Sequence, residues 1–102
     1  MTPAEMTTQL LAMGFTRGDQ EADLGLTREW LIYLKRVHQN QHQCLWLTTY
    51  DDRFVEALLQ VYSKPFNSRA RPAMIPLHIM LYRTMDDIVT AVGRVYEGKA
   101  PS

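Results

Sequence analysis

The feature that most constrains this chain is a regular alternation of apolar residues between positions 74 and 83. Side chains alternate between the two faces of a β-strand with a period of two residues, so this spacing predicts a strand. We expect Ile75, Leu77, Ile79 and Leu81 to face the helices. Pro76 has no backbone N–H to donate, and this indicates a bulge or an edge segment.

Two further strands are predicted between positions 28 and 49. Residues 28–37 also fit a helix capped by Thr27, but their aromatic and β-branched content favours a strand. The polar residues 38–43 then form a hairpin connection, although they lack the glycine that is typical of tight hairpins. Residues 44–49 follow as the partner strand.

The first predicted helix begins with the segment Thr2-Pro3-Ala4-Glu5. This segment combines a hydroxyl cap, a proline at the first helical position and a glutamate three residues after the cap. Apolar residues at Met6, Leu10, Met13 and in part Leu11 supply the buried stripe. Gly14 supplies a left-handed stop.

Two more helices are predicted. One begins at Thr49 or Asp51 and ends before Pro65, since a proline disfavours helix in the residue before it. The other is capped by Thr84, carries Asp86 and Asp87 near its positive end, and ends at Gly98.

The predicted fold class is therefore α+β, a small open sheet of about three strands with three helices in the order α-β-β-α-β-α. A right-handed crossover through the second helix joins the hairpin to the third strand. Residues 16–27 are predicted as loop with a short edge strand near Ala22 to Leu26. Residues 63–73 form a second loop, and residues 1–102 form a single domain.

Residues 49–62 and 84–96 match each other with a single gap, and both contain an Asp-Asp pair near their start. The first explanation is convergence, because a strand followed by an acidic cap and an amphipathic helix produces much of this pattern. The second is a duplicated β-α unit. Both explanations predict two helices that pack through the same kind of face.

Charge and cysteine content exclude several classes of protein. Eleven basic and eleven acidic residues cancel, so net charge gives no argument for a nucleic-acid or membrane partner. The single cysteine, Cys44, excludes an intrachain disulfide and fits the cytoplasm. The longest apolar run, Trp30 to Leu34, is far shorter than the ~20 residues of a membrane helix, and the N-terminus has no signal-peptide pattern.

No catalytic or metal site is predicted. The pairs Asp51-Asp52 and Asp86-Asp87 are interpreted as helix caps rather than as metal ligands. His38, His42 and Cys44 have zinc-ligand chemistry, but a structural site requires a fourth ligand and none is apparent. We expect no enzyme activity, no cofactor and no metal.

The first functional hypothesis is a protein-interaction module, acting as a homodimer, an adaptor or an inhibitor of a larger partner. The second sheet face carries surplus apolar side chains, which are typical of an interface. We predict that it binds the partner through Trp46, Met74, His78, Met80 and Tyr82. The competing explanation is that the N-terminal helix covers this face. Small neutral chains of this kind are common among accessory proteins of phages and plasmids.

The alternative hypothesis is a nucleic-acid-binding regulatory protein. No acidic residue lies between Glu56 and Asp86, and this interval carries the predicted contacts Lys64, Arg69, Arg71 and Arg83. Arginine beside aromatic and amide groups is typical of a surface that follows phosphates. Four positive charges are few for such a surface, and solvated loops have a similar composition.

Overall fold

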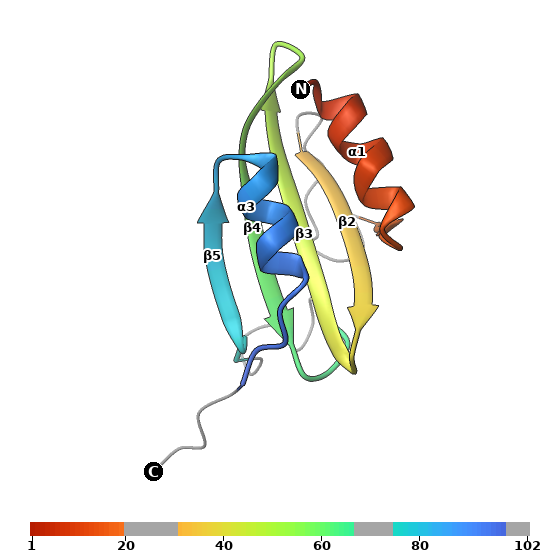
Figure 1. The fold of residues 1–102 in the computed structure, drawn as a ribbon, viewed down its shortest axis with the longest axis vertical. Helices are drawn as coiled ribbons and strands as arrows, with labels where there is room; N and C mark the ends of the chain where they lie inside the picture. The colour runs from red at the N-terminus through yellow and green to blue at the C-terminus, as the bar shows by residue number, and fades with distance from the viewer. Residues whose placement is uncertain (20–30, 67–74, 98–102) are drawn as a thin grey trace.

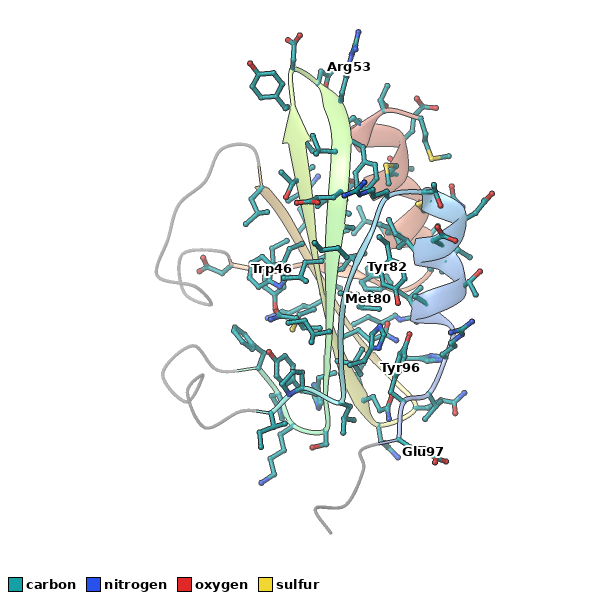
Figure 2. All side chains as sticks on the ribbon, turned by 90° about the vertical axis from the view of Figure 1, so that its left-hand side faces the viewer. Trp46, Arg53, Met80, Tyr82, Tyr96 and Glu97 are labelled. Atoms are coloured by element: carbon teal, nitrogen blue, oxygen red, sulfur yellow. The ribbon has the colours of Figure 1, made fainter. Side chains whose placement is uncertain are left out.

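The computed structural model describes residues 1–19, 31–66 and 75–97, and Figure 1 shows their arrangement. A five-stranded sheet in the order β1-β2-β3-β4-β5 dominates, and every pair of neighbouring strands is antiparallel. Both described helices lie on the same side of this sheet (Figure 2). The elements are α1 (Pro3–Ala12), β1 (Thr16–Arg17), β2 (Leu31–His38), β3 (Gln41–Tyr50), β4 (Arg53–Tyr62), β5 (His78–Tyr82) and α3 (Met85–Val92).

The predicted fold class, a sheet of about three strands with three helices in the order α-β-β-α-β-α, is wrong. Among the described residues, the sheet has five strands and there are two helices. The right-handed crossover is also wrong, because each strand pairs with the next described strand in the sequence. The edge strand expected near Ala22 to Leu26 lies outside the described residues, and β1 was not predicted.

The start of α1 agrees with the sequence prediction. The Thr2 hydroxyl accepts a hydrogen bond from the Glu5 backbone N–H at 3.2 Å, and the Glu5 carboxylate accepts one from the Thr2 N–H at 3.1 Å. These reciprocal bonds satisfy two N–H groups that a helix start otherwise leaves without partners. Gly14 follows the helix with φ of 102°, a conformation that glycine adopts without steric cost.

Two-residue turns join the three long central strands. Gln39 and Asn40 have φ of 48° and 64°, and Asp51 and Asp52 have φ of 51° and 57°. Positive φ at both central residues is the geometry of type I′ hairpin turns, and Asn and Asp tolerate it better than most residues. The connection predicted over residues 38–43 is therefore too long, and Asp51-Asp52 forms a turn rather than a helix start.

The helix predicted after Thr49 or Asp51 is wrong, because Arg53–Tyr62 is strand β4. Its apolar residues fit both periods: Ala57, Leu59 and Val61 point into the core, while Leu58 and Tyr62 lie on the other face. Hydrogen-bonded pairing with β3 on one side and β5 on the other makes this segment a strand rather than a helix. The matching segments 49–62 and 84–96 thus have different secondary structures, and a duplicated β-α unit is excluded.

The last helix, α3, starts as predicted and ends early. The Thr84 hydroxyl accepts a hydrogen bond from the Asp87 backbone N–H at 3.1 Å, and Asp86 and Asp87 lie in the first turn. The helix ends at Val92 with Gly93 as its cap, not at Gly98, which lies outside the described residues. The core lies between the helices and the sheet and includes Met6, Leu10, Leu34, Leu45, Leu47, Ala57, Leu59, Val61, Ile88, Ala91 and Val92.

The predicted strand over residues 74–83 is correct in kind and wrong in orientation. It is β5 (His78–Tyr82), at the edge of the sheet as Pro76 indicated. Met80 pairs with Leu59, a core residue, so Met80 lies on the helix-covered face. Ile79 and Leu81, expected to face the helices, lie on the opposite face, which we call the open face.

Candidate functional site

The open face carries a row of apolar side chains in register across four strands. Leu81 of β5 pairs with Leu58 of β4, Leu58 pairs with Trp46 of β3, and Trp46 pairs with Tyr33 of β2. Directly opposed residues lie on the same face of a sheet, within contact distance of each other. The row is almost fully buried at Tyr33 and becomes 53% exposed at Leu81.

The open face is covered within the chain around Tyr33 and Trp46. The Tyr33 and Trp46 rings stack with centroids 3.8 Å apart, and the indole N–H donates a hydrogen bond to Gln60 Oε1 at 2.8 Å. The ring of Phe66 contacts Trp46 edge-on at 6.4 Å between centroids. Trp46 is only 4% exposed, so the structure places this predicted partner-binding residue on the expected face but buries it.

Residue Gly18 lies directly on the Tyr33 ring. Its backbone N–H donates to the Tyr33 carbonyl at 3.0 Å, and a Cβ at this position would lie 2.2 Å from the ring. Only glycine permits this approach. The competing explanation from the sequence, that the N-terminal helix covers this face, is wrong, because α1 packs on the opposite face with Met6 and Leu10 in the core.

A cavity of about 250 Å³ opens beside this covered region. Its lining includes Tyr33, Lys35, His42, Cys44 and Phe66. The Cys44 thiol is buried and accepts a hydrogen bond from the Tyr33 hydroxyl at 3.3 Å.

The three zinc-type residues do not converge. His42 and Cys44 lie on the open face, whereas His38 pairs with Gln41 and lies on the helix-covered face. Within the described ranges, no group of three or more His, Cys, Asp or Glu side chains is placed to hold a metal ion.

The β5 end of the sheet is different from the covered end. Ile79, Met80 and Leu81, which we call the β5 margin, are 55%, 54% and 53% exposed. They lie on an edge strand that contains no charged residue, and in the described part of the chain only β4 pairs with it. Figure 2 looks onto this edge, with Met80 toward the viewer.

His78 and Tyr82 belong to the helix-covered face and are half-buried. The His78 ring stacks on Tyr96 with centroids 4.1 Å apart, and its Nε2 lies 2.7 Å from the Tyr82 hydroxyl. Burial lowers the pKa of His78, and nearby Arg94 lowers it further. Burial and the neighbouring Tyr82 raise the pKa of Tyr96 to about 12. Figure 2 shows Tyr82 and Tyr96 on one side of the sheet and Trp46 on the other.

The remaining predicted residues are placed as follows. Met74, Arg69 and Arg71 lie outside the described residues. Lys64 and Arg83 are exposed, but they lie beyond opposite ends of the β4–β5 ladder, which runs from Val61↔His78 to Ala57↔Tyr82. Four residues of strand separate these pairs by ~13 Å. The described part of the predicted basic surface is therefore not a cluster, and nucleic-acid binding stays a prediction.

Sequence reasoning missed the residues that tie both helices to the sheet. The Arg36 guanidinium donates to the backbone carbonyl of Met13 after α1, at 3.1 Å, and to that of Val92 at the end of α3. It also donates to Gln43 Oε1 at 3.0 Å. Polar residues at the helix-facing positions of two strands were the available signal, since a buried amide or guanidinium requires partners.

Sequence reasoning also missed Ile79 and Leu81 as exposed residues, because alternation identifies two faces without saying which one meets the helices.

Comparison of the chain with protein-family models, with curated proteins and with solved structures gives no match. No described helix has both the length and the apolar content needed to cross a membrane.

Proposed function

We propose that this protein is a non-catalytic protein-interaction module that binds another polypeptide as an added strand on the outer edge of β5. One observation carries the proposal. β5 is an uncharged edge strand whose central residues Ile79, Met80 and Leu81 are each more than half exposed. The proposal includes a reducing compartment such as the cytoplasm, as the single cysteine predicts.

The outer edge of a sheet presents backbone N–H and C=O groups that no neighbouring strand satisfies. Proteins that do not use such an edge protect it with charged residues, prolines, short strands or a covering element. At the other edge of this sheet, β1 is two residues long and contains Arg17. β5 is longer and contains no Lys, Arg, Asp or Glu, and its two polar side chains, His78 and Tyr82, lie within hydrogen-bond distance of each other.

The side chains of the β5 margin supply apolar contacts on both faces of an added strand. On the open face Leu81 lies opposite Leu58 and Ile79 lies opposite Gln60. Met80 lies on the helix-covered face. In strand addition, main-chain hydrogen bonds provide affinity and alternate side chains provide specificity. Met80 is flexible enough to fit different neighbouring side chains.

The proposal is tested by photo-crosslinking in the cells that encode the protein. The full chain carries a photoreactive amino acid at position 81, and a matched variant carries it at Val37. Val37 is 62% exposed on the open face. Its strand, β2, is three strands away from β5, so the two strands are ~14 Å apart. We expect a protein adduct at position 81 that disappears when Ile79→Lys is added, and none at position 37.

Equal adducts at both positions would contradict the proposal, because nonspecific collisions reach every exposed site. Absence of any adduct at position 81 would contradict it as well.

A further inference from the structure

We infer that the strand added to β5 is β5 of a second copy of this chain, paired antiparallel about a two-fold axis at Met80. This inference rests on the proposed function and specifies its partner. The relevant observations are the composition of the strand, its register on β4 and the neutral charge of the chain.

The sequence of β5 is self-complementary about its centre. A two-fold axis at Met80 opposes Met80 to its own copy, Ile79 to Leu81 of the second copy, and His78 to Tyr82 of the second copy. Ile79 and Leu81 are both aliphatic, similarly exposed and on the same face. Aliphatic pairs of this kind stabilise antiparallel strands.

The outer pair is chemically matched too. Within one chain, His78 Nε2 already lies 2.7 Å from the Tyr82 hydroxyl, so these two side chains act as hydrogen-bond partners. In the dimer they stand opposite each other twice. No like charges oppose each other along residues 78–82, because β5 contains no Asp, Glu, Lys or Arg. The eleven basic and eleven acidic residues give each copy no net charge to repel the other.

The axis lies perpendicular to the sheet, so each face of one copy continues as the same face of the other. The five strands of each copy join into one sheet of ten, because β5 is the last strand in the order β1-β2-β3-β4-β5. The helices of both copies then lie on one side. On the open face, the row Tyr33, Trp46, Leu58 and Leu81 continues into Ile79 of the second copy.

Sedimentation of the full chain over a concentration series tests the inference. A five-residue strand is a small interface, so the series extends to ~1 mM. We expect the wild-type chain to form a dimer. Leu81→Lys, which places a charge opposite Ile79 twice per dimer, should weaken it at least ~10-fold. Val37→Lys is the matched control and should leave it unchanged.

A charge pair tests the register. Mixing Leu81→Lys with Ile79→Glu restores association, because the introduced ammonium and carboxylate stand opposite each other about the axis at Met80. Mixing Leu81→Lys with Leu81→Glu restores less of it, since these two positions are diagonal neighbours rather than directly opposed. Thermal unfolding followed by circular dichroism shows whether each variant is folded, and we expect near-wild-type transitions because both side chains are half-exposed.

Each outcome separates the two claims. A wild-type chain that is monomeric at the highest concentration overturns self-pairing. Strand addition by another protein is then tested separately, by the crosslinking at position 81. A dimer that Leu81→Lys leaves intact also overturns self-pairing, because its interface then lies elsewhere. Equal rescue by both mixtures overturns the register at Met80.

Discussion

Replacing Arg36 by methionine should destabilise the whole fold, because this one side chain joins both helices to the sheet. Its guanidinium donates to the Met13 carbonyl after α1, to the Val92 carbonyl at the end of α3 and to the buried amide of Gln43. It also lies 4.7 Å from the centroid of the Phe15 ring. A cation beside the carbonyl ends of two helices is further favoured by their dipoles.

The expected fall in the free energy of unfolding follows from the hydrogen bonds that the partners of Arg36 lose. Gln43 is 1% exposed and its Oε1 accepts a hydrogen bond from the Arg36 guanidinium, so losing this donor from a buried amide costs about 1–3 kcal/mol. The Val92 carbonyl keeps a hydrogen bond from Gln43 Nε2 at 2.7 Å, which limits the loss there. Methionine retains part of the packing. We therefore expect the free energy of unfolding to fall by ~3 kcal/mol.

For a domain of this size, that loss lowers Tm by ~12–24 °C. Urea unfolding and thermal melting followed by circular dichroism measure both quantities. Lys35→Met is the matched control, because Lys35 is the exposed neighbour on the same strand, and its effect should stay within about 0.5 kcal/mol. An Arg36→Met variant that loses less than ~1 kcal/mol, or no more than the control, would refute the argument.

Two further predictions concern the two faces of the sheet. Gly18→Ala should destabilise the fold by ~1–3 kcal/mol in urea unfolding, because its Cβ would overlap the buried Tyr33 ring; unchanged stability would show that this ring is free to move. The lowered pKa of His78 means that the unfolded chain takes up a proton first as pH falls below the ordinary value of 6.5. The contribution of neutral His78 to the free energy of unfolding is therefore fully present above pH 6.5. It declines below that pH until His78 of the folded protein also takes up a proton. His78→Phe should keep the ring contact and reduce this decline, and an identical pH profile for both proteins would contradict the assignment.

The ends of the helices were largely predictable from the sequence. Capping is a local interaction, so it can be seen in the spacing of a few residues. The structure contains the predicted cap of α1 by Thr2 and Glu5 and the predicted cap of α3 by Thr84. Gly14 has the positive φ that was predicted for the end of α1. The end of α3 was not predictable in the same way. Gly98 and Gly93 both fit a stop, and the hydrogen bond from the Tyr96 backbone to Gln41, at 2.9 Å, joins the segment after α3 to a distant strand.

Strand β4 shows where local reasoning fails. The apolar residues of Arg53–Tyr62 satisfy the helical period and the strand period together, because both faces of β4 contact apolar neighbours. Asp51 and Asp52 resemble a helix start and also tolerate the left-handed conformation of a tight turn. Pairing with β3 and β5 resolves the ambiguity, and such pairing is nonlocal.

The candidate surface was predictable in part. The sequence indicated an edge strand near Pro76, and β5 is at the edge of the sheet. The second apolar face was predicted to join Trp46 with His78, Met80 and Tyr82, but Trp46 lies on the open face and the other three on the helix-covered face. The sequence did not show that Gly18 and Phe66 lie against the open face. Nor did it show that Leu81, rather than Trp46, is the exposed member of the row.

The outer edge of β5 is most directly tested by hydrogen–deuterium exchange of the backbone amides of residues 78–82. Amides that point away from β4 exchange rapidly in an isolated chain, and a bound strand protects them. We predict that their exchange slows as the protein concentration rises, while the amides of β1 keep a constant rate. Constant exchange across β5 at every concentration, and in the presence of any crosslinked partner, would contradict binding at this edge.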